Sequence, residues 1–138
     1  MKENTEKMIS SKMEKLLYDT ASKISENAYA PFSGFKVGAA LLTSSGSIYT
    51  GVNVENSSYG AAICAERTAF VKAISEGERE FVAIAVAAGS TESFPCGICR
   101  QFMYEFGSEL YIITGTDREN LNVRKLSQLF PVGFVLKR

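Results

Sequence analysis

Residues 81–88 read Phe-Val-Ala-Ile-Ala-Val-Ala-Ala, a nearly continuous apolar run of strand length. A run of this kind predicts a strand covered on both faces, because no polar side alternates with the apolar one. Helical segments are predicted on either side, at residues 65–75 before Gly77 and at residues 99–106 before Gly107. We therefore expect a buried strand that follows one helix and precedes another.

The rest of the chain predicts a first helix, a hairpin, one more strand and a short tail. The segments are a helix at 5–27 that stops before Pro31, a hairpin at 37–43 and 48–54, a strand at 110–114, an edge strand at 121–123 and a short helix at 125–130. This order predicts an α/β sandwich with the hairpin on one side and right-handed parallel crossovers on the other. No linker or repeat divides the chain, so we expect a single domain over residues 1–138.

Composition excludes several classes of protein. Fifteen Lys and Arg balance fifteen Asp and Glu, so the chain lacks the basic footprint of nucleic-acid binding, and we expect no nucleic acid partner. No apolar run approaches the roughly 18 residues that cross a bilayer, and the N-terminus is polar. An odd number of cysteines, three, cannot close into a full set of intrachain disulfides. We therefore expect a cytoplasmic protein with no membrane partner.

The chain contains no histidine. This excludes every mechanism that uses imidazole as base, nucleophile partner or metal ligand, including the Ser-His-Asp and Cys-His arrangements. Any metal chemistry must therefore be carried out by thiolates and carboxylates.

All three cysteines are predicted to lie at helix N-termini. Cys64 stands immediately before one helix, and Cys96 and Cys99 stand in the first turn of another. The positive end of the helix dipole and the free N–H groups there favour the thiolate, which is the metal-binding form. A Cys-x-x-Cys pair and a third cysteine supply three vertices of a tetrahedron. Zn²⁺ with three protein ligands and one open position is the catalytic arrangement.

Two charged residues follow Cys64 in the same predicted turn. The Glu66 side chain can lie beside the metal without being a ligand, and from there it could transfer a proton from water to a substrate. Three thiolates and Zn²⁺ sum to a charge of −1, and we hypothesise that Arg67 partly offsets it.

Other interpretations of these residues exist. A free cysteine is often a small buried hydrophobe, and Cys-x-x-Cys alone could be a redox pair. A closed structural zinc site would need Glu66 as its fourth ligand. Neither a redox pair nor a buried hydrophobe explains the spacing of Cys64 and Glu66. A ligand two residues before a glutamate, followed later by Pro-Cys-x-x-Cys, is typical of zinc-dependent nucleobase deaminases.

Four blocks of sequence resemble the small homotetrameric cytidine deaminases of pyrimidine salvage. They are residues 28–40 (AYAPFSGFKVGAA), 51–59 (GVNVENSSY), 64–69 (CAERTA) and 95–101 (PCGICRQ). The resemblance implies a three-layer α-β-α sandwich around a five-stranded mixed sheet and one zinc ion per subunit. It also implies hydrolysis of cytidine or 2′-deoxycytidine to uridine or 2′-deoxyuridine plus ammonia, in a homotetramer.

The resemblance also implies a role for each matching residue. Cys64, Cys96 and Cys99 would be the zinc ligands, and Glu66 the proton shuttle that serves N3 of the pyrimidine. The Ala65 N–H and Glu66 would together hold the edge of the base. Asn53 and Glu55 would bind the ribose 3′-hydroxyl. Phe35 would pack on the base. Tyr59 and Phe134 would approach an active site across subunit boundaries.

Two residues depart from the family pattern. Phe94 stands where a small hydroxyl residue is frequent and could narrow the mouth of the pocket, and Ile98 is bulkier than the frequent alanine. Three rival functions remain open. They are a deaminase of another aminopyrimidine nucleoside of the antibiotic-detoxifying type, a tRNA or DNA deaminase, and a non-catalytic zinc module.

Overall fold

The computed structural model describes residues 9–136. Its strands are β1 (Gly38–Thr43), β2 (Ile48–Val52), β3 (Phe81–Ala87), β4 (Tyr111–Asp117) and β5 (Asn120–Lys125). Its helices are α2 (Ser11–Ile24), α3 (Ala65–Ser75), α4 (Gly97–Tyr104) and α5 (Leu126–Leu129), with 3-10 turns η1 (Ser25–Asn27) and η2 (Tyr59–Ala61). The strands form one mixed sheet in the order β2-β1-β3-β4-β5.

The central strand β3 is the apolar run predicted to be covered on both faces. Its side chains alternate between two cores because successive residues of a strand point to opposite sides. Ile84 and Val86 lie in the core that includes α3 and α4, whereas Ala83 and Ala85 lie in the core that includes α2. All four are fully buried, so the prediction for this strand is confirmed.

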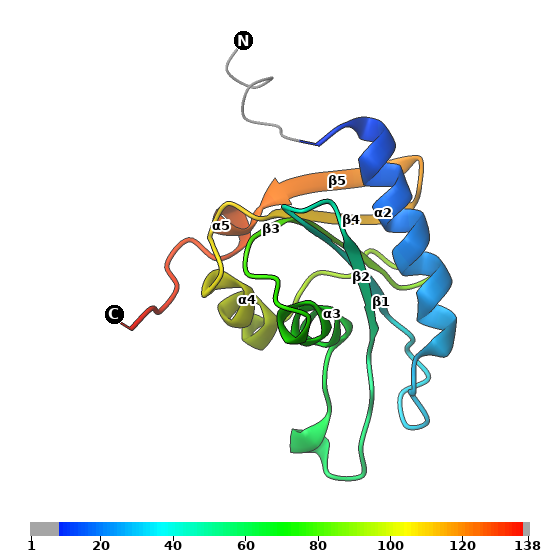
Figure 1. The fold of residues 1–138 in the computed structure, drawn as a ribbon. Helices are drawn as coiled ribbons and strands as arrows, with labels where there is room; N and C mark the ends of the chain where they lie inside the picture. The colour runs from blue at the N-terminus through cyan, green and yellow to red at the C-terminus, as the bar shows by residue number, and fades with distance from the viewer. Residues whose placement is uncertain (1–8, 137–138) are drawn as a thin grey trace.

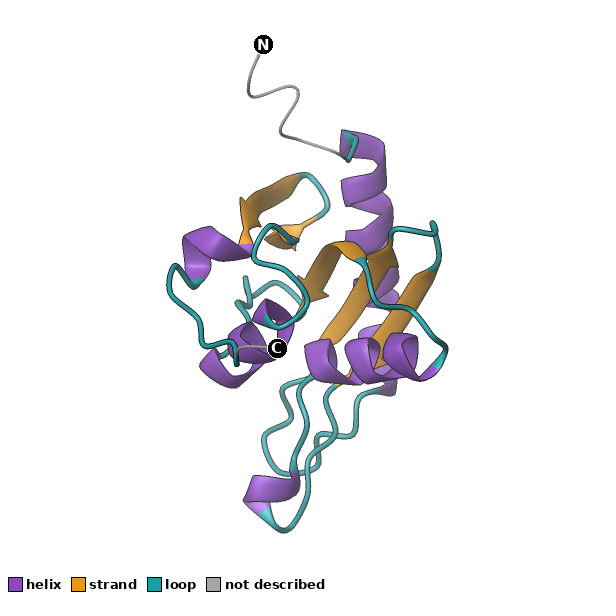
Figure 2. Ribbon diagram, turned by 60° about the vertical axis from the view of Figure 1, so that its left-hand side comes forward, coloured by secondary structure: helices purple, strands orange, loops and turns teal. Residues whose placement is uncertain are grey.

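The molecule has three layers. Figure 1 shows α2 on one face of the sheet and α3 and α4 on the other, and the turned view of Figure 2 shows the same layers. The sandwich implied by the resemblance is therefore confirmed. Across residues 9–136, no helix combines the length and the apolar character that a bilayer span requires.

The strand directions explain how one face acquires both helices of the site. Strand β1 pairs antiparallel with β2 and with β3, and β3 pairs parallel with β4. Strands β2, β3 and β4 therefore point the same way, and α3 and α4 are the predicted crossovers that link them. Helix α3 follows β2 and helix α4 follows β3, so both helices begin at the edge of the sheet where these two strands end. Their N-termini can therefore lie close together.

Several element boundaries differ from the prediction by a few residues. The first helix begins at Ser11, where the Ser10 side chain accepts a hydrogen bond from the Met13 N–H, and residues 25–27 form a 3-10 turn. The predicted residues 5–8 lie outside the described part of the chain. Helix α4 begins at Gly97 because Cys96 is its N-cap. Strands β4 and β5 are longer than predicted, since a tight turn after Asp117 pairs them further.

Candidate active site

Cysteines from two helix starts converge at one point. Cys64 is the N-cap of α3, Cys96 is the N-cap of α4, and Cys99 lies in the first turn of α4. Their sulfur atoms lie within 4.8 Å of one another, with 3.7 Å between those of Cys64 and Cys96. All three are free cysteines. Cys64 thus joins two cysteines that lie 32 and 35 positions further along the chain, and the three present their sulfur atoms to one point in space.

The Arg67 side chain lies against this cluster. Its Nη2 atom donates to the Cys64 sulfur at 3.7 Å, while its buried Nε has no hydrogen-bond partner among residues 9–136. A hydrogen bond from the Cys99 thiol lowers the pKa of Cys64 to about 5, and the Arg67 guanidinium also contributes. The N-terminus of α3 adds partial positive charge at the same point. These contacts favour the thiolate form of Cys64.

Glu66 is the buried acid of the site. It lies in the first turn of α3, is only 4% exposed, and lines the same cleft as Cys64 and Cys96. Burial raises the pKa of Glu66 to about 7, and the nearby Cys64 thiolate raises it as well. A carboxyl group with a pKa near neutrality is suited to both accepting and donating protons at neutral pH.

A cleft of about 490 Å³ opens beside the cysteines. This volume lies within the range of small-molecule sites. Of the residues singled out in the sequence, those that line it are Phe35, Asn53, Glu55, Tyr59, Cys64, Ala65, Glu66, Arg67, Phe94, Cys96 and Ile98. Phe134 does not line the cleft of its own chain; it is 66% exposed on the C-terminal segment. The cleft therefore unites the loops before β1 and after β2 with the starts of α3 and α4.

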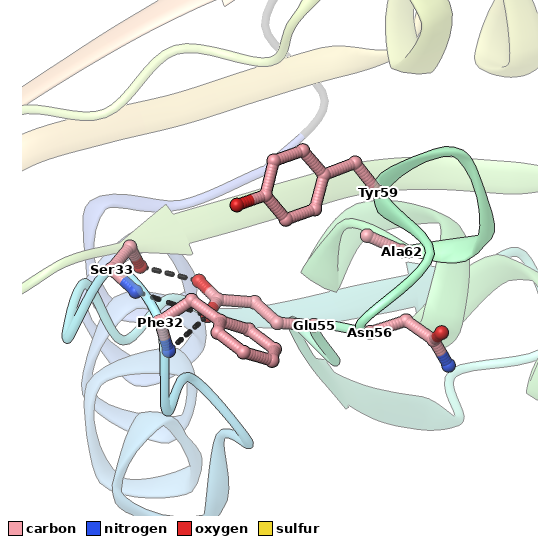
Figure 3. A pocket seen from close by; sticks show the side chains of 6 residues that line it. All are labelled: Phe32, Ser33, Glu55, Asn56, Tyr59 and Ala62. Carbon is pink, nitrogen blue, oxygen red and sulfur yellow. Dashed lines mark hydrogen bonds between the residues drawn. The ribbon is translucent and has the colours of Figure 1, made fainter.

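Asn53 and Glu55 hold the loop that carries Phe35. The Glu55 carboxylate accepts hydrogen bonds from the backbone N–H groups of Phe32 and Ser33, at 2.9 and 3.1 Å, and from the Ser33 hydroxyl (Figure 3). The Asn53 side chain donates to the Phe35 carbonyl at 2.8 Å and accepts from the Val37 N–H, also at 2.8 Å. The hydrogen bond from Ser33 is the main reason that the pKa of Glu55 is lowered. Both side chains thus place the aromatic wall of the cleft.

Tyr59 stands at the open side of the cleft. It is 82% exposed, and its ring meets the Phe32 ring edge-on at 6.4 Å between centroids. Together with Ser33, Glu55, Asn56 and Ala62, these two rings border a second hollow of about 380 Å³ (Figure 3).

Three residues have contacts for which the sequence predicted no role. The Ser33 hydroxyl, besides donating to Glu55, accepts from the Phe35 N–H at 2.9 Å. Arg100 donates to the Pro95 and Leu129 carbonyls, each at 2.8 Å. Gln101 donates to the Phe134 carbonyl at 2.7 Å and accepts from the Phe134 N–H at 3.0 Å. All three residues lie inside the sequence blocks that resemble the family, and this position is what could have indicated a role for them.

A protein-family comparison decides the relationship. The model of the cytidine and deoxycytidylate deaminase zinc-binding region matches residues 11–114. The chain belongs to this deaminase family.

Relatives within the deaminase family are similar over most of the chain. A probable cytidine deaminase of Dictyostelium discoideum is 54% identical over 102 residues, which are 72% of this chain and 69% of the relative. A cytidine deaminase of Halalkalibacterium halodurans is 45% identical over 86% of this chain and 92% of its own. The solved structure of cytidine deaminase from Burkholderia pseudomallei superimposes with a TM-score of 0.81 at 44% identity, covering 86% of this chain and 97% of that one.

The cysteine cluster fits the metal that the deaminase family binds. Zn²⁺ prefers thiolate ligands in a tetrahedral arrangement, and a catalytic site leaves one of the four positions open. Cys64, Cys96 and Cys99 are positioned to bind one such ion, with Arg67 and two helix N-termini opposing the thiolate charge. Zinc is therefore the cofactor of this deaminase.

Proposed function

We propose that this chain is a single-domain cytidine deaminase whose one domain spans residues 1–138. It converts cytidine and 2′-deoxycytidine, with one water, to uridine and 2′-deoxyuridine and releases ammonia. The observation that carries the proposal is the buried Glu66, which shares a nucleoside-sized cleft with Cys64 and Cys96, whose sulfurs converge with that of the buried Cys99.

The three cysteines would hold the metal beside the cleft. A bound zinc ion supplies Lewis acidity, which makes water nucleophilic at neutral pH. Arg67 opposes the negative charge of the three thiolates through its contact with Cys64.

Glu66 moves the protons of the reaction. The water oxygen forms a bond to C4 of the pyrimidine, and the C4–N bond to the amino group breaks. Of the two protons of the water, one ends on N3 of the uracil ring and the other on the departing ammonia, and the Glu66 carboxyl carries both. A buried carboxyl group with a pKa of about 7 can accept the first proton and return it at the same pH.

The remaining cleft residues bind the nucleoside. Phe35 offers a flat apolar wall to the base, and the Ala65 N–H lies at the start of α3 beside Glu66. An amide and a carboxylate together have more hydrogen-bonding sites than the loop uses. One N–H of Asn53 and one acceptor site of Glu55 thus stay available for the 3′-hydroxyl of the ribose.

We further propose that the chain acts in the cytoplasm as a homotetramer, as its resemblance to the small cytidine deaminases implies, and exposed apolar side chains favour self-association. They include Tyr29, Phe32, Tyr59, Ile98, Val132 and Phe134. Apolar groups that gather on one surface commonly mark an interaction site. Phe134 is exposed, does not line the cleft of its own chain, and has its backbone held by Gln101, so we propose that its side chain contacts a second copy of the chain.

One assay tests the activity. The zinc-loaded protein should consume cytidine and 2′-deoxycytidine, followed by the loss of cytidine absorbance, and chelation of the metal should stop the reaction. Glu66→Gln should lower kcat/KM by about 10²- to 10⁴-fold while leaving the fold intact. The matched control is Glu80→Gln, which changes an exposed glutamate. A zinc-loaded wild type that leaves both nucleosides untouched would overturn the proposal, and turnover of another aminopyrimidine nucleoside alone would identify the rival deaminase.

A further inference from the structure

The wall of the cleft next to the cysteines contains the aromatic ring of Phe94. Phe94 lies two residues before Cys96, lines the same cleft, and keeps 42% of its surface exposed. Its ring is therefore available to a molecule in the cleft. The side chain belongs to the segment that leads from β3 into α4, so its position depends on how that segment is held.

A charged group on another strand holds the ring. The Arg124 guanidinium of β5 lies over the Phe94 ring, 5.4 Å from its centroid, which is within cation–π range. Arg124 is in turn 4.0 Å from the Glu92 carboxylate. That same carboxylate oxygen accepts hydrogen bonds from the Thr114 hydroxyl at 2.6 Å and from the Asn122 amide at 2.8 Å. Side chains of β4 and β5 thus hold the segment between β3 and α4 through their contacts with Glu92 and Phe94.

The backbone of the segment is also held at both ends. The Thr91 N–H donates to the Ala88 carbonyl at 3.1 Å, which closes the turn after β3. At the other end, Arg100 donates to the Pro95 carbonyl at 2.8 Å and to the Leu129 carbonyl of α5. Phe94 is therefore a fixed part of the wall rather than a mobile flap.

The chemistry of the cleft determines which edge of a base meets this ring. If the function proposed above holds, C4 of the pyrimidine lies toward the cysteines and N3 lies toward Glu66 of α3. In the pyrimidine ring C4 is flanked by N3 and C5, so the C5 edge lies away from Glu66. Phe94 lines the cleft from the segment that leads into α4, whereas Glu66 lines it from the first turn of α3. We therefore expect the C5 edge, which faces away from Glu66, to meet Phe94.

We propose that Phe94, positioned by Arg124 and Glu92, determines substrate specificity by excluding cytosine nucleosides that carry a methyl group at C5. This inference rests on the proposed function. Phe94 would contact the base directly, whereas Arg124 and Glu92 are positioning residues that act through the ring.

The test compares kcat/KM for 5-methylcytidine and cytidine in the zinc-loaded protein. Phe94→Ala should raise the ratio of the two values about 10-fold or more, which is the usual effect of a methyl group on a tight pocket. Arg124→Met should raise the ratio about 3-fold, because the ring loses its cation, and Arg124→Lys should restore part of it. The control is Arg118→Met, on the turn between β4 and β5, which should leave the ratio unchanged.

A second measurement separates this inference from the proposed function. The affinities of 5-methyluridine and uridine, measured by calorimetry, report the shape of the wall without any turnover. Phe94→Ala, or Phe94→Leu if the alanine variant does not fold, should raise the affinity of 5-methyluridine relative to uridine. An unchanged ratio in both measurements would overturn the inference. A wild type that binds uridine but does not deaminate cytidine would instead overturn the proposed function.

Discussion

Arg67 is the residue whose side chain most directly opposes the charge of the thiolates. Its guanidinium contacts the Cys64 sulfur, and its Nε atom is buried. Arg67→Met keeps much of the side-chain volume and removes the charge. We expect zinc affinity or kcat to fall about 10- to 100-fold, as for other groups that contact metal ligands.

The measurements for Arg67→Met are zinc content after dialysis against a weak chelator and the steady-state rate at saturating zinc. Arg118→Met is the control, because Arg118 pairs with exposed Asp19 and Glu119 and lies outside the cleft. Normal zinc retention and normal kinetics in Arg67→Met would refute the role in charge balance.

Ser33 connects Glu55 to the loop that carries Phe35. Its hydroxyl donates to Glu55 and accepts from the Phe35 N–H. Ser33→Ala removes both contacts, each of which is worth about 0.5–1.5 kcal/mol. We expect KM for cytidine to rise roughly 2- to 10-fold with little change in kcat, because the aromatic wall is less well placed while Glu66 is untouched.

The measurement for Ser33→Ala is steady-state kinetics beside a thermal melt. Ser57→Ala is the matched control, since Ser57 is also an exposed loop serine but, unlike Ser33, does not border the second hollow. A fall in kcat with KM unchanged would contradict the positioning role of Ser33.

At the scale of elements, helix α3 reaches its position because β2 has no side chain at Gly51. A Cβ there would overlap the Ala65 carbonyl oxygen and the Ala69 backbone, so helix and strand could not approach as they do. Gly51→Ala should destabilise the protein by about 1–3 kcal/mol. It should also lower activity, because Cys64 and Glu66 move with the start of the helix.

Urea unfolding curves and the rate of cytidine loss measure these two effects. Gly60→Ala is the control for the unfolding measurement, because a Cβ at Gly60 has no neighbour within 4 Å. Equal stability of the two variants would show that α3 can shift without cost, and the close approach would then not explain its position.

At the scale of the whole molecule, the exposure of Tyr59 and Phe134 predicts that activity depends on assembly. If neighbouring copies complete each cleft, dilution should lower specific activity over the same concentration range in which the oligomer dissociates. Light scattering and rate measurements on one dilution series test this. A fully active monomer would refute the shared site.

Much of the fold and the metal cluster could be predicted from local patterns. The apolar run at 81–88, the helix formers at 65–75 and the cysteine spacings are local signals, and the structure has the corresponding strand, helix and thiol cluster. Boundaries were less exact where a cap or a turn sets the end, as at Cys96 and Asp117. Those ends depend on single hydrogen bonds that apolar periodicity does not report.

The sequence by itself determined the chemistry available to this protein. Without histidine, its three cysteines and one nearby glutamate are the groups left for a zinc site. The tertiary structure alone decided that Glu66 is buried enough to hold a proton near neutral pH. It also decided that Asn53 and Glu55 grip the Phe35 loop and that Arg124 covers Phe94. The physical reason is that burial and contacts between residues far apart in the chain arise only when the layers pack, whereas residue type and local spacing exist before folding.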